Sequence, residues 1–191
     1  MAGIAVSESD VDVVALLMRQ HGDIRNLFDE VERSTGDDRR NAFRRLVRLL
    51  AVHETAEEEV IHPFTRTSVT GGEGVVEDRL TEERTAKETL AGLDGTDTDD
   101  PKFLSELLTL RTEVMAHARA EERYEFIHIR RTADPERLTS LAGAIKAAEA
   151  MAPTRPHPGT ESAAKNMTLG PVAALVDRTR DAVRSAMGKD G

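Results

Sequence analysis

The chain has 191 residues, with 35 acidic against 26 basic side chains, a formal net charge of −9 and no cysteine. This composition excludes disulfides, thiolate metal sites and cysteine nucleophiles, and its acidic balance argues against binding to nucleic acid or to anionic membranes. No stretch approaches the roughly 18 apolar residues of a membrane span. We therefore expect a cytoplasmic, helix-rich domain, in which any metal ligand must be His, Asp or Glu.

Four long segments show helical periodicity and are separated by short breaks, so the expected helices span about 10–33, 38–64, 75–93 and 101–131. Ser7 or Ser9 is expected to cap the first helix, and Pro63 is expected to end the second. Short connections force consecutive helices to be antiparallel neighbours. The sequence therefore predicts an all-α fold, an up-down-up-down four-helix bundle over residues 1–131.

A C-terminal helical extension is expected over residues 132–191. A proline directly after an aspartate predicts the start of a helix over about 135–151. The proline-rich segment 152–170 is expected to be a linker, and an amphipathic helix is expected over about 171–187. We expect this last helix to pack on the bundle, on a protein partner or on a second copy of the chain.

The apolar stripe of each bundle helix is interrupted near its middle by imidazole or carboxylate side chains. Buried charged groups cost several kcal/mol unless they are paired or bind a metal, so four such interruptions need a common cause. The interrupting residues are His21 on the first helix, His53 and Glu57 on the second, Glu83 on the third, and His117 and Glu121 on the fourth.

These interruptions are expected to fall at one level of the bundle. Residues equidistant from the turn of an antiparallel hairpin lie side by side. His21 and His53 are symmetric about position 37, in the first turn. Glu83 is symmetric with Glu57 about position 70 and with His117 about position 100. The six side chains should therefore converge at mid-bundle.

The spacing His-x-x-x-Glu occurs twice in the core register, as His53 with Glu57 and as His117 with Glu121. Residues four apart share one face of a helix, so each pair presents an imidazole and a carboxylate together. Imidazole and carboxylate without thiolate suit iron, manganese or zinc. Several carboxylates that could bridge favour two metal ions over one.

A histidine on the first helix, followed by His-x-x-x-Glu on the second and fourth, resembles the hemerythrin-like HHE cation-binding domains of the bacterial, actinobacterial type. The segments that carry the resemblance are QHGDIRNLFDEVE (20–32), HETAEEEVIHP (53–63) and HARAEERYEF (117–126). The resemblance implies two non-heme iron ions, bridged by Glu57 and Glu121 and by an oxo, hydroxo or water group. It also implies that His21, His53 and His117 are terminal ligands.

The third helix departs from the family pattern. Oxygen-carrying hemerythrins have two histidines there, four residues apart, and the matching positions are Glu83 and Lys87. Glu83 can ligate as a carboxylate, whereas Lys87 is expected beside the ligands. Some HHE domains use the residue after the second-helix histidine as a ligand, which is Glu54 here. More carboxylates and fewer imidazoles favour O₂, H₂O₂ or NO chemistry, or iron sensing, over reversible O₂ carriage.

The tyrosine and the remaining histidines are expected beside the site or outside it. Tyr124 lies one turn from Glu121, where it either packs in the core or donates a hydrogen bond to the site. His62 and His128 are expected as structural or rim residues, and His157 in the linker. The pairs Glu59-x-x-His62 and Glu125-x-x-His128 also fit a ferritin-like di-iron protein. That weaker alternative needs a long crossover between the second and third helices.

The sequence thus favours a di-iron protein that handles O₂, H₂O₂ or NO, with catalase-like peroxide decomposition as one expected activity. A non-enzymatic iron or oxygen sensor is the main alternative, and a purely structural interaction bundle is a third. The expected partners are these small molecules, and neither nucleic acid nor a membrane.

Overall fold

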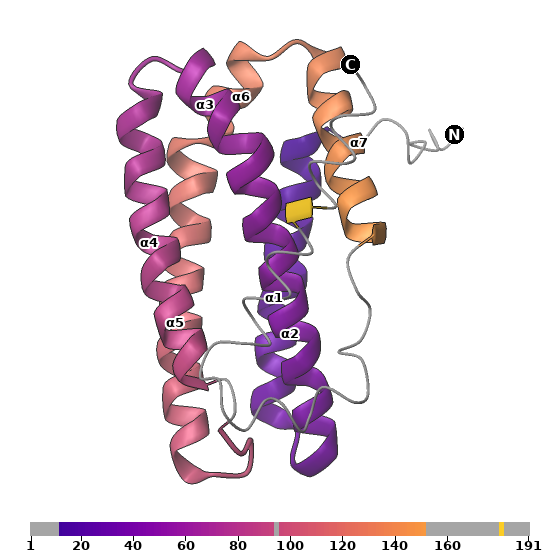
Figure 1. Ribbon diagram of the computed structural model, residues 1–191, viewed down its shortest axis with the longest axis vertical. Helices are drawn as coiled ribbons and strands as arrows, with labels where there is room; N and C mark the ends of the chain where they lie inside the picture. Colours follow the sequence, from indigo (N-terminus) through magenta and orange to yellow (C-terminus); the bar gives the residue numbers. More distant parts are fainter. Residues whose placement is uncertain (1–11, 94–95, 152–179, 182–191) are drawn as a thin grey trace, which may run out of the picture.

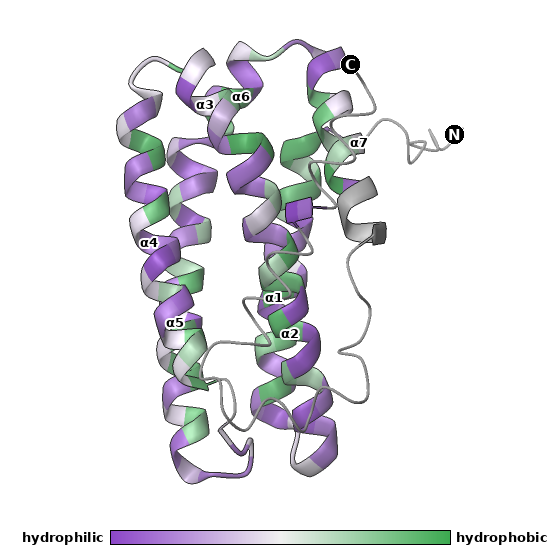
Figure 2. Cartoon of the chain, viewed as in Figure 1, coloured by the Kyte–Doolittle hydropathy of each residue, from purple (hydrophilic) through white to green (hydrophobic). Residues whose placement is uncertain are grey.

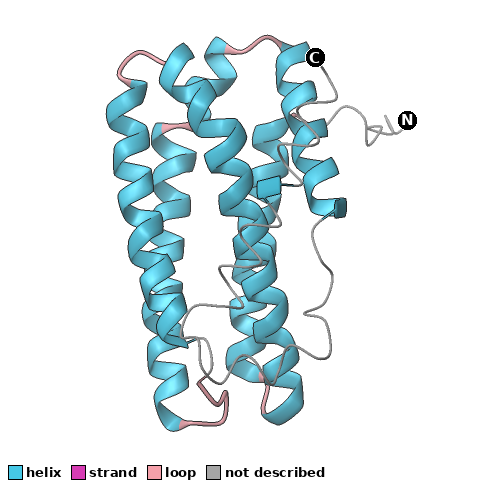
Figure 3. Ribbon diagram, viewed as in Figure 1, coloured by secondary structure: helices cyan, strands magenta, loops and turns pink. Residues whose placement is uncertain are grey.

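A computed structural model describes residues 12–93, 96–151 and 180–181 of the chain. Within these ranges every regular element is a helix, and the long helices run side by side in alternating directions (Figure 1). The bundle consists of α1 (Val13–Arg33), α2 (Gly36–Ala56), α4 (Gly72–Leu93) and α5 (Pro101–Tyr124). Short turns join consecutive helices (Figure 3), which confirms the up-down-up-down four-helix bundle.

The first helix starts at Val13, because Asp12 caps it. The Asp12 carboxylate accepts a hydrogen bond of 2.7 Å from the backbone N–H of Ala15. An aspartate in this position satisfies one of the free N–H groups of the first turn. The expectation of a serine cap was therefore wrong; Ser7 and Ser9 lie outside the described residues.

The second expected helix contains one π-helical turn. It runs as α2 to Ala56, passes through the π-helix η2 (Glu57–Ile61), and continues as α3 (His62–Ser68). Pro63 was expected to end the helix, yet it lies in the first turn of α3. A proline is tolerated there because a first turn does not use its missing N–H. The π turn thus lets the helix continue past Pro63.

The fourth expected helix is interrupted at Glu125. Glu125 has φ −119° and ψ −58°, and it separates α5 from α6 (Phe126–Thr132). After a turn at Asp134 the chain forms α7 (Pro135–Met151), which occupies the range expected for a helix and packs across α1. The linker 152–170 lies outside the described residues, as does the helix 171–187 except for Arg180 and Asp181.

Two apolar clusters fill the bundle. The α7-side cluster joins α1, η2, α6 and α7 around Leu17, Ile61 and Phe126. The turn-side cluster joins α1, α2, α4 and α5 around Phe28, Leu46 and Phe103, near the opposite end. Hydrophobic residues recur along the inner faces of the helices, while hydrophilic residues cover the outer faces (Figure 2). A buried polar layer separates the two clusters.

None of the described helices is long and apolar enough to span a lipid bilayer.

Candidate metal centre

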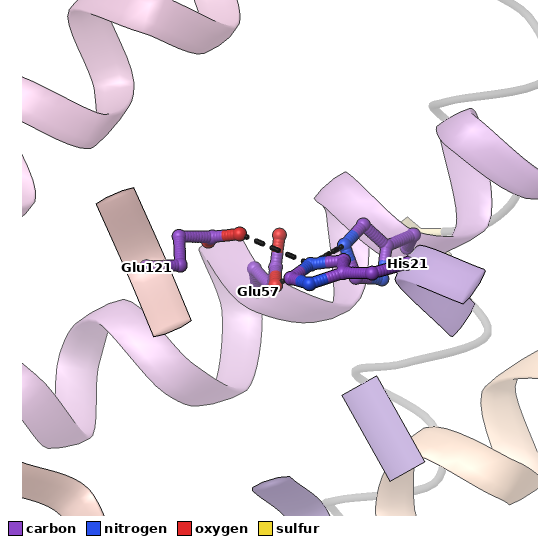
Figure 4. A group of neighbouring side chains, drawn as sticks. His21, Glu57 and Glu121 are labelled. Atoms are coloured by element: carbon purple, nitrogen blue, oxygen red, sulfur yellow. Dashed lines mark hydrogen bonds and ion pairs between the residues drawn. The ribbon is translucent and has the colours of Figure 1, made fainter. Parts of the chain in front are cut away.

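Four buried side chains converge in the polar layer between the two apolar clusters. His21 comes from α1, His53 from α2, Glu57 from the start of η2 and Glu121 from α5. One ligand atom from each lies within 4.8 Å of the others. Figure 4 shows the carboxylates of Glu57 and Glu121 beside the imidazole of His21. The predicted convergence of these four side chains is therefore present.

The two histidines face each other through their Nε2 atoms. Nε2 of His21 lies 3.0 Å from Nε2 of His53 and 3.3 Å from a carboxylate oxygen of Glu121. Nε2 of His53 lies 3.3 Å from Oε1 of Glu57. Burial, reinforced by the neighbouring His21, lowers the pKa of His53 to about 3, so its imidazole is neutral and available to a metal.

Several ligand-type atoms in this layer have no hydrogen-bond partner. They are both carboxylate oxygens of Glu57, both of Glu121, one oxygen of Glu125, and Nε2 of His117. Burying such groups without a hydrogen bond costs free energy, and native proteins do so rarely. The side chains are imidazoles and carboxylates, which are ligands for iron, manganese or zinc. The residues present therefore fit a metal centre.

Glu57 shows the cost of this arrangement most clearly. The residue is fully buried, and burial, together with the nearby carboxylates of Glu121, Glu83 and Glu125, raises its pKa well above the ordinary value. The pKa of the neighbouring Glu121 is shifted in the opposite direction. Although burial opposes the shift, His117 and His21 hold the pKa of Glu121 well below its usual range. Bound cations would stabilise both groups as carboxylates.

His117 continues the site on the side of α4 and α5. Its Nε2 lies 3.4 Å from Oε1 of Glu121, and its Nδ1 lies 3.0 Å from Glu82. Arg79 donates to the other oxygen of Glu82 at 2.8 Å, so a chain of polar contacts orients the His117 ring. Despite burial, the carboxylate of Glu121 raises the pKa of His117 well above its ordinary value.

Glu83 lies in the same layer but is paired with cations. One of its oxygens is 2.7 Å from Nε2 of His62, and the other accepts a hydrogen bond of 3.1 Å from Lys87. Lys87 also contacts Glu58, and lies 3.5 Å from Glu54. Burial raises the pKa of Glu54 to about 7. Glu54 thus faces Lys87, and it is not a member of the four-residue group around His21.

Of the two expected roles of His62, structural or rim, the rim position was wrong. His62 is 1 % exposed, with Nε2 on Glu83 and Nδ1 3.4 Å from Glu125. Nine residues of regular α-helix would place His62 about 180° around the axis from His53. The π turn between them adds a residue to one turn and rotates His62 inward. His128, in contrast, is exposed, as expected of a rim residue.

Tyr124 was expected in the core or as a donor to the site, and it does neither. It is 53 % exposed, and the guanidinium group of Arg123 lies over its ring. Glu125 takes the inward position instead, because the buried row of α5 ends with two successive steps of four residues, from His117 to Glu121 to Glu125. This i, i+4 row was the sequence signal for Glu125.

The residues that orient the predicted ligands were not predicted from the sequence. Gln20 lies 2.7 Å from Nδ1 of His53, and Glu122 lies 2.9 Å from Nδ1 of His21. Gln20, Glu82 and Glu122 each adjoin a predicted site residue in the sequence. That adjacency was the available signal, but polar residues are common beside such positions and it does not single them out.

Residues 12–126 match the family model of the hemerythrin HHE cation binding domain. With the helical bundle and the His/Glu layer described above, the chain belongs to the hemerythrin HHE cation-binding family. The ferritin-like alternative is therefore wrong. That fold needs a long crossover between the second and third helices of the bundle, whereas here the short segment 69–71 joins α3 to α4.

The fold is shared with a crystal structure of a hemerythrin HHE cation binding domain-containing protein from Mycobacterium kansasii. The TM-score is 0.67 at 21 % sequence identity, and the match covers 88 % of this chain and 99 % of that one. A DNA nickase from Nostoc sp. is 27 % identical over 143 residues, which is 74 % of this chain. The chain spans 40 % of the length of that relative.

Proposed function

We propose that this chain is a hemerythrin-like protein that holds two non-heme iron ions and reacts with O₂, H₂O₂ or NO, with peroxide decomposition as its first activity to test. The observation that carries the proposal is the buried layer of ligand atoms on Glu57, Glu121 and His117 that have no hydrogen-bond partner and whose ion-pair contacts within the layer are 3.3–3.4 Å long. An apolar cluster closes this layer on each side. Such a layer is costly without a metal and is satisfied by one.

Two ions are favoured by the number and spread of the carboxylates. Glu57, Glu83 and Glu121 are each no more than 1 % exposed, and each is held by a different helical element. We infer that His21 and His53 would hold one ion and that His117 and Glu83 would hold the other, with Glu57 and Glu121 as further ligands. Glu54 and Lys87 would tune the charge beside the second ion. Manganese or zinc would suit the same donors.

The protein's own contribution is to hold the ligands in place and to limit water. Hydrogen bonds from ring nitrogens to Gln20, Glu122 and Glu82 fix the orientation of three imidazoles. The side chains have no redox chemistry of their own. When bound, iron would supply the redox chemistry that converts O₂, H₂O₂ or NO. The proposal places this chemistry in the cytoplasm and needs no nucleic acid or membrane.

The activity is tested by measuring O₂ release from H₂O₂ with iron-loaded protein. We expect release well above that of an equal amount of free iron, and its loss in His53→Ala. His128→Ala is the matched control, because His128 is an exposed histidine on α6. Release no faster than that of free iron would contradict peroxide decomposition as the activity. Titrating the same protein with NO, followed by visible absorption, then tests the other reactants.

An iron or oxygen sensor remains the second candidate, on one specific observation. Arg180, in the C-terminal extension, pairs with Glu58 at 3.2 Å and with Glu59 at 3.0 Å. Glu58 also pairs with Lys87, which contacts Glu83. Ion pairs thus connect the buried polar layer to the C-terminal extension. A sensor predicts that iron loading changes protease cleavage within 152–191, and unchanged cleavage would contradict it.

A further inference from the structure

One pattern is shared by the three histidines of the predicted ligand set. Each turns Nε2 toward a buried carboxylate of the layer, Glu121 or Glu57, and each has an oxygen acceptor at Nδ1. These acceptors are Glu122 for His21, Gln20 for His53 and Glu82 for His117. Metal-ligating histidines almost always donate the second ring N–H to such an acceptor, which fixes the tautomer and the ring orientation.

His62 has the same arrangement, although neither the metal-binding pattern of the family nor the sequence periodicity assigns it. Its Nδ1 lies 3.4 Å from Oε1 of Glu125, and its Nε2 lies 2.7 Å from Oε1 of Glu83. Thr65 donates a hydrogen bond of 2.6 Å to that same oxygen of Glu125, so the acceptor is itself held. His62, Thr65 and Glu125 are each no more than 1 % exposed.

The local backbone is built to bring His62 to this position. His62 is the residue after the π turn, and its N–H bonds to the carbonyl oxygen of Glu57. A π turn is costly in isolation and occurs frequently at functional sites. In a regular α-helix, a residue five positions after Glu57 would lie about 140° around the axis. The π turn therefore lets Glu57 and His62 face the same layer.

Among the described residues, two of the buried carboxylates around His62, those of Glu57 and Glu125, have no lysine or arginine in contact, and the only cationic partner of Glu125 is the His62 ring itself. Glu57, Glu83 and Glu125 are fully or almost fully buried here, and one oxygen of Glu125 and both of Glu57 have no hydrogen-bond partner. Lys87 is a cation here, but its contacts are with Glu54, Glu58 and Glu83 and not with Glu57 or Glu125. A second metal ion at this place would bring the missing charge.

We propose that His62 is a ligand of the second metal ion through Nε2, beside Glu83, and that Glu125 orients the His62 ring. His62 thereby takes the role of an imidazole that α4 does not provide, because α4 has Glu83 and Lys87 at the relevant positions. This inference rests on the proposed two-metal function. It adds to it an imidazole ligand from the junction of η2 and α3, and an orienting carboxylate from the break between α5 and α6.

The alternative is that His62 only pairs with Glu83 and holds it in place. Both roles predict that a change at His62 weakens metal binding, so affinity alone is not sufficient. They differ in whether the metal is bonded to the His62 ring. A paramagnetic ion such as Co²⁺ strongly shifts the NMR signal of the N–H of every imidazole bonded to it, and leaves other imidazoles much less affected.

The test is Co²⁺ titration of the metal-free full-length chain, followed by absorption and by NMR with ¹⁵N-labelled histidine. We expect two equivalents to bind and strongly shifted N–H signals from His21, His53, His62 and His117. In His62→Gln we expect the second equivalent to bind at least about 100-fold more weakly, because losing a ligand exceeds the 10- to 100-fold effect of losing an orienting group. The matched control His128→Gln should bind as the unaltered chain does.

Shifted signals from His21, His53 and His117 alone in the fully loaded chain would overturn the inference. This measurement needs no variant, so it decides the matter even if His62→Gln fails to fold. Second-equivalent affinity within threefold of the unaltered chain in folded His62→Gln would overturn it as well. Uptake of fewer than two equivalents by the unaltered chain would instead contradict the two-metal function on which the inference rests.

Discussion

Nε2 of His21 lies 3.0 Å from Nε2 of His53, although the two residues are 32 positions apart in the sequence. Each ring also has an oxygen acceptor at Nδ1, Glu122 for His21 and Gln20 for His53. A neutral imidazole has one N–H, so two neutral rings that donate through Nδ1 would point two lone pairs at each other. A cation held by His21 and His53 would remove this repulsion.

Removing the metal should destabilise the fold. A ligand that binds only the folded state adds about 2.7 kcal/mol of stability when its free concentration is 100 times its Kd. For a chain of this size, that corresponds to a shift of roughly 5–10 °C in the unfolding temperature. We expect a decrease of at least this size on chelation, measured by calorimetry of matched iron-loaded and chelated samples. Equal unfolding temperatures would contradict a metal within the polar layer.

Glu57→Gln should affect the metal-free and metal-loaded proteins in opposite directions. Glutamine has nearly the shape of glutamate but carries no charge, so the variant removes a buried carboxylate whose oxygens have no hydrogen-bond partner. We expect the metal-free variant to be more stable by about 1 kcal/mol or more, and metal binding to be lost. Chemical denaturation with and without metal measures both effects. Destabilisation of the metal-free chain would show that Glu57 has a structural partner.

Glu54 should make the stability of the metal-free protein depend on pH. Burial raises the pKa of Glu54 to about 7 in the folded chain, above its unfolded value near 4.5. The folded state therefore binds more protons between these two pH values, so its stability falls as the pH rises through that interval. Replacing Glu54 with Gln should remove up to about 3 kcal/mol of this decrease. Glu106→Gln, at an exposed position of α5, should leave the pH profile unchanged.

Gln20 should act on the metal through His53. Gln20→Leu removes the acceptor at Nδ1, and the loss of such an orienting partner lowers metal affinity by about 10- to 100-fold. Gln20→Glu keeps an oxygen at the same place and should restore most of the affinity. The measurement is competition with a chelator of known affinity, at equal far-ultraviolet circular dichroism. Unchanged affinity in Gln20→Leu would contradict the orienting role.

The fold and much of the polar layer could be predicted from the sequence, because both depend on regular periods. Short turns fix which helices are antiparallel, and symmetry about a turn places His21 beside His53, where the structure has them in contact. The same reasoning places Glu83 and His117 in the layer, and both are buried there. A buried layer between apolar clusters follows from helical periodicity alone.

The part that could not be predicted lies where the helical period changes. The π turn before His62 and the break at Glu125 each rotate the following side chains, and no residue type specifies such a change. The inward position of His62 therefore could not be predicted. Glu125, in contrast, continues the i, i+4 row of His117 and Glu121, so its inward position, and with it the outward position of Tyr124, had a sequence signal that was missed. The acceptors Gln20, Glu82 and Glu122 depend on side-chain geometry across helices, which a period does not determine.

The iron content of the purified protein decides whether the polar layer holds two iron ions. The chain should be purified after iron-replete expression, without chelators, and its iron and protein measured on the same sample together with its visible spectrum. The proposed centre predicts two iron atoms per chain and visible absorption, both reduced in His53→Ala and unchanged in His128→Ala. Protein that is folded yet iron-free and colourless would show that the layer is not an iron centre.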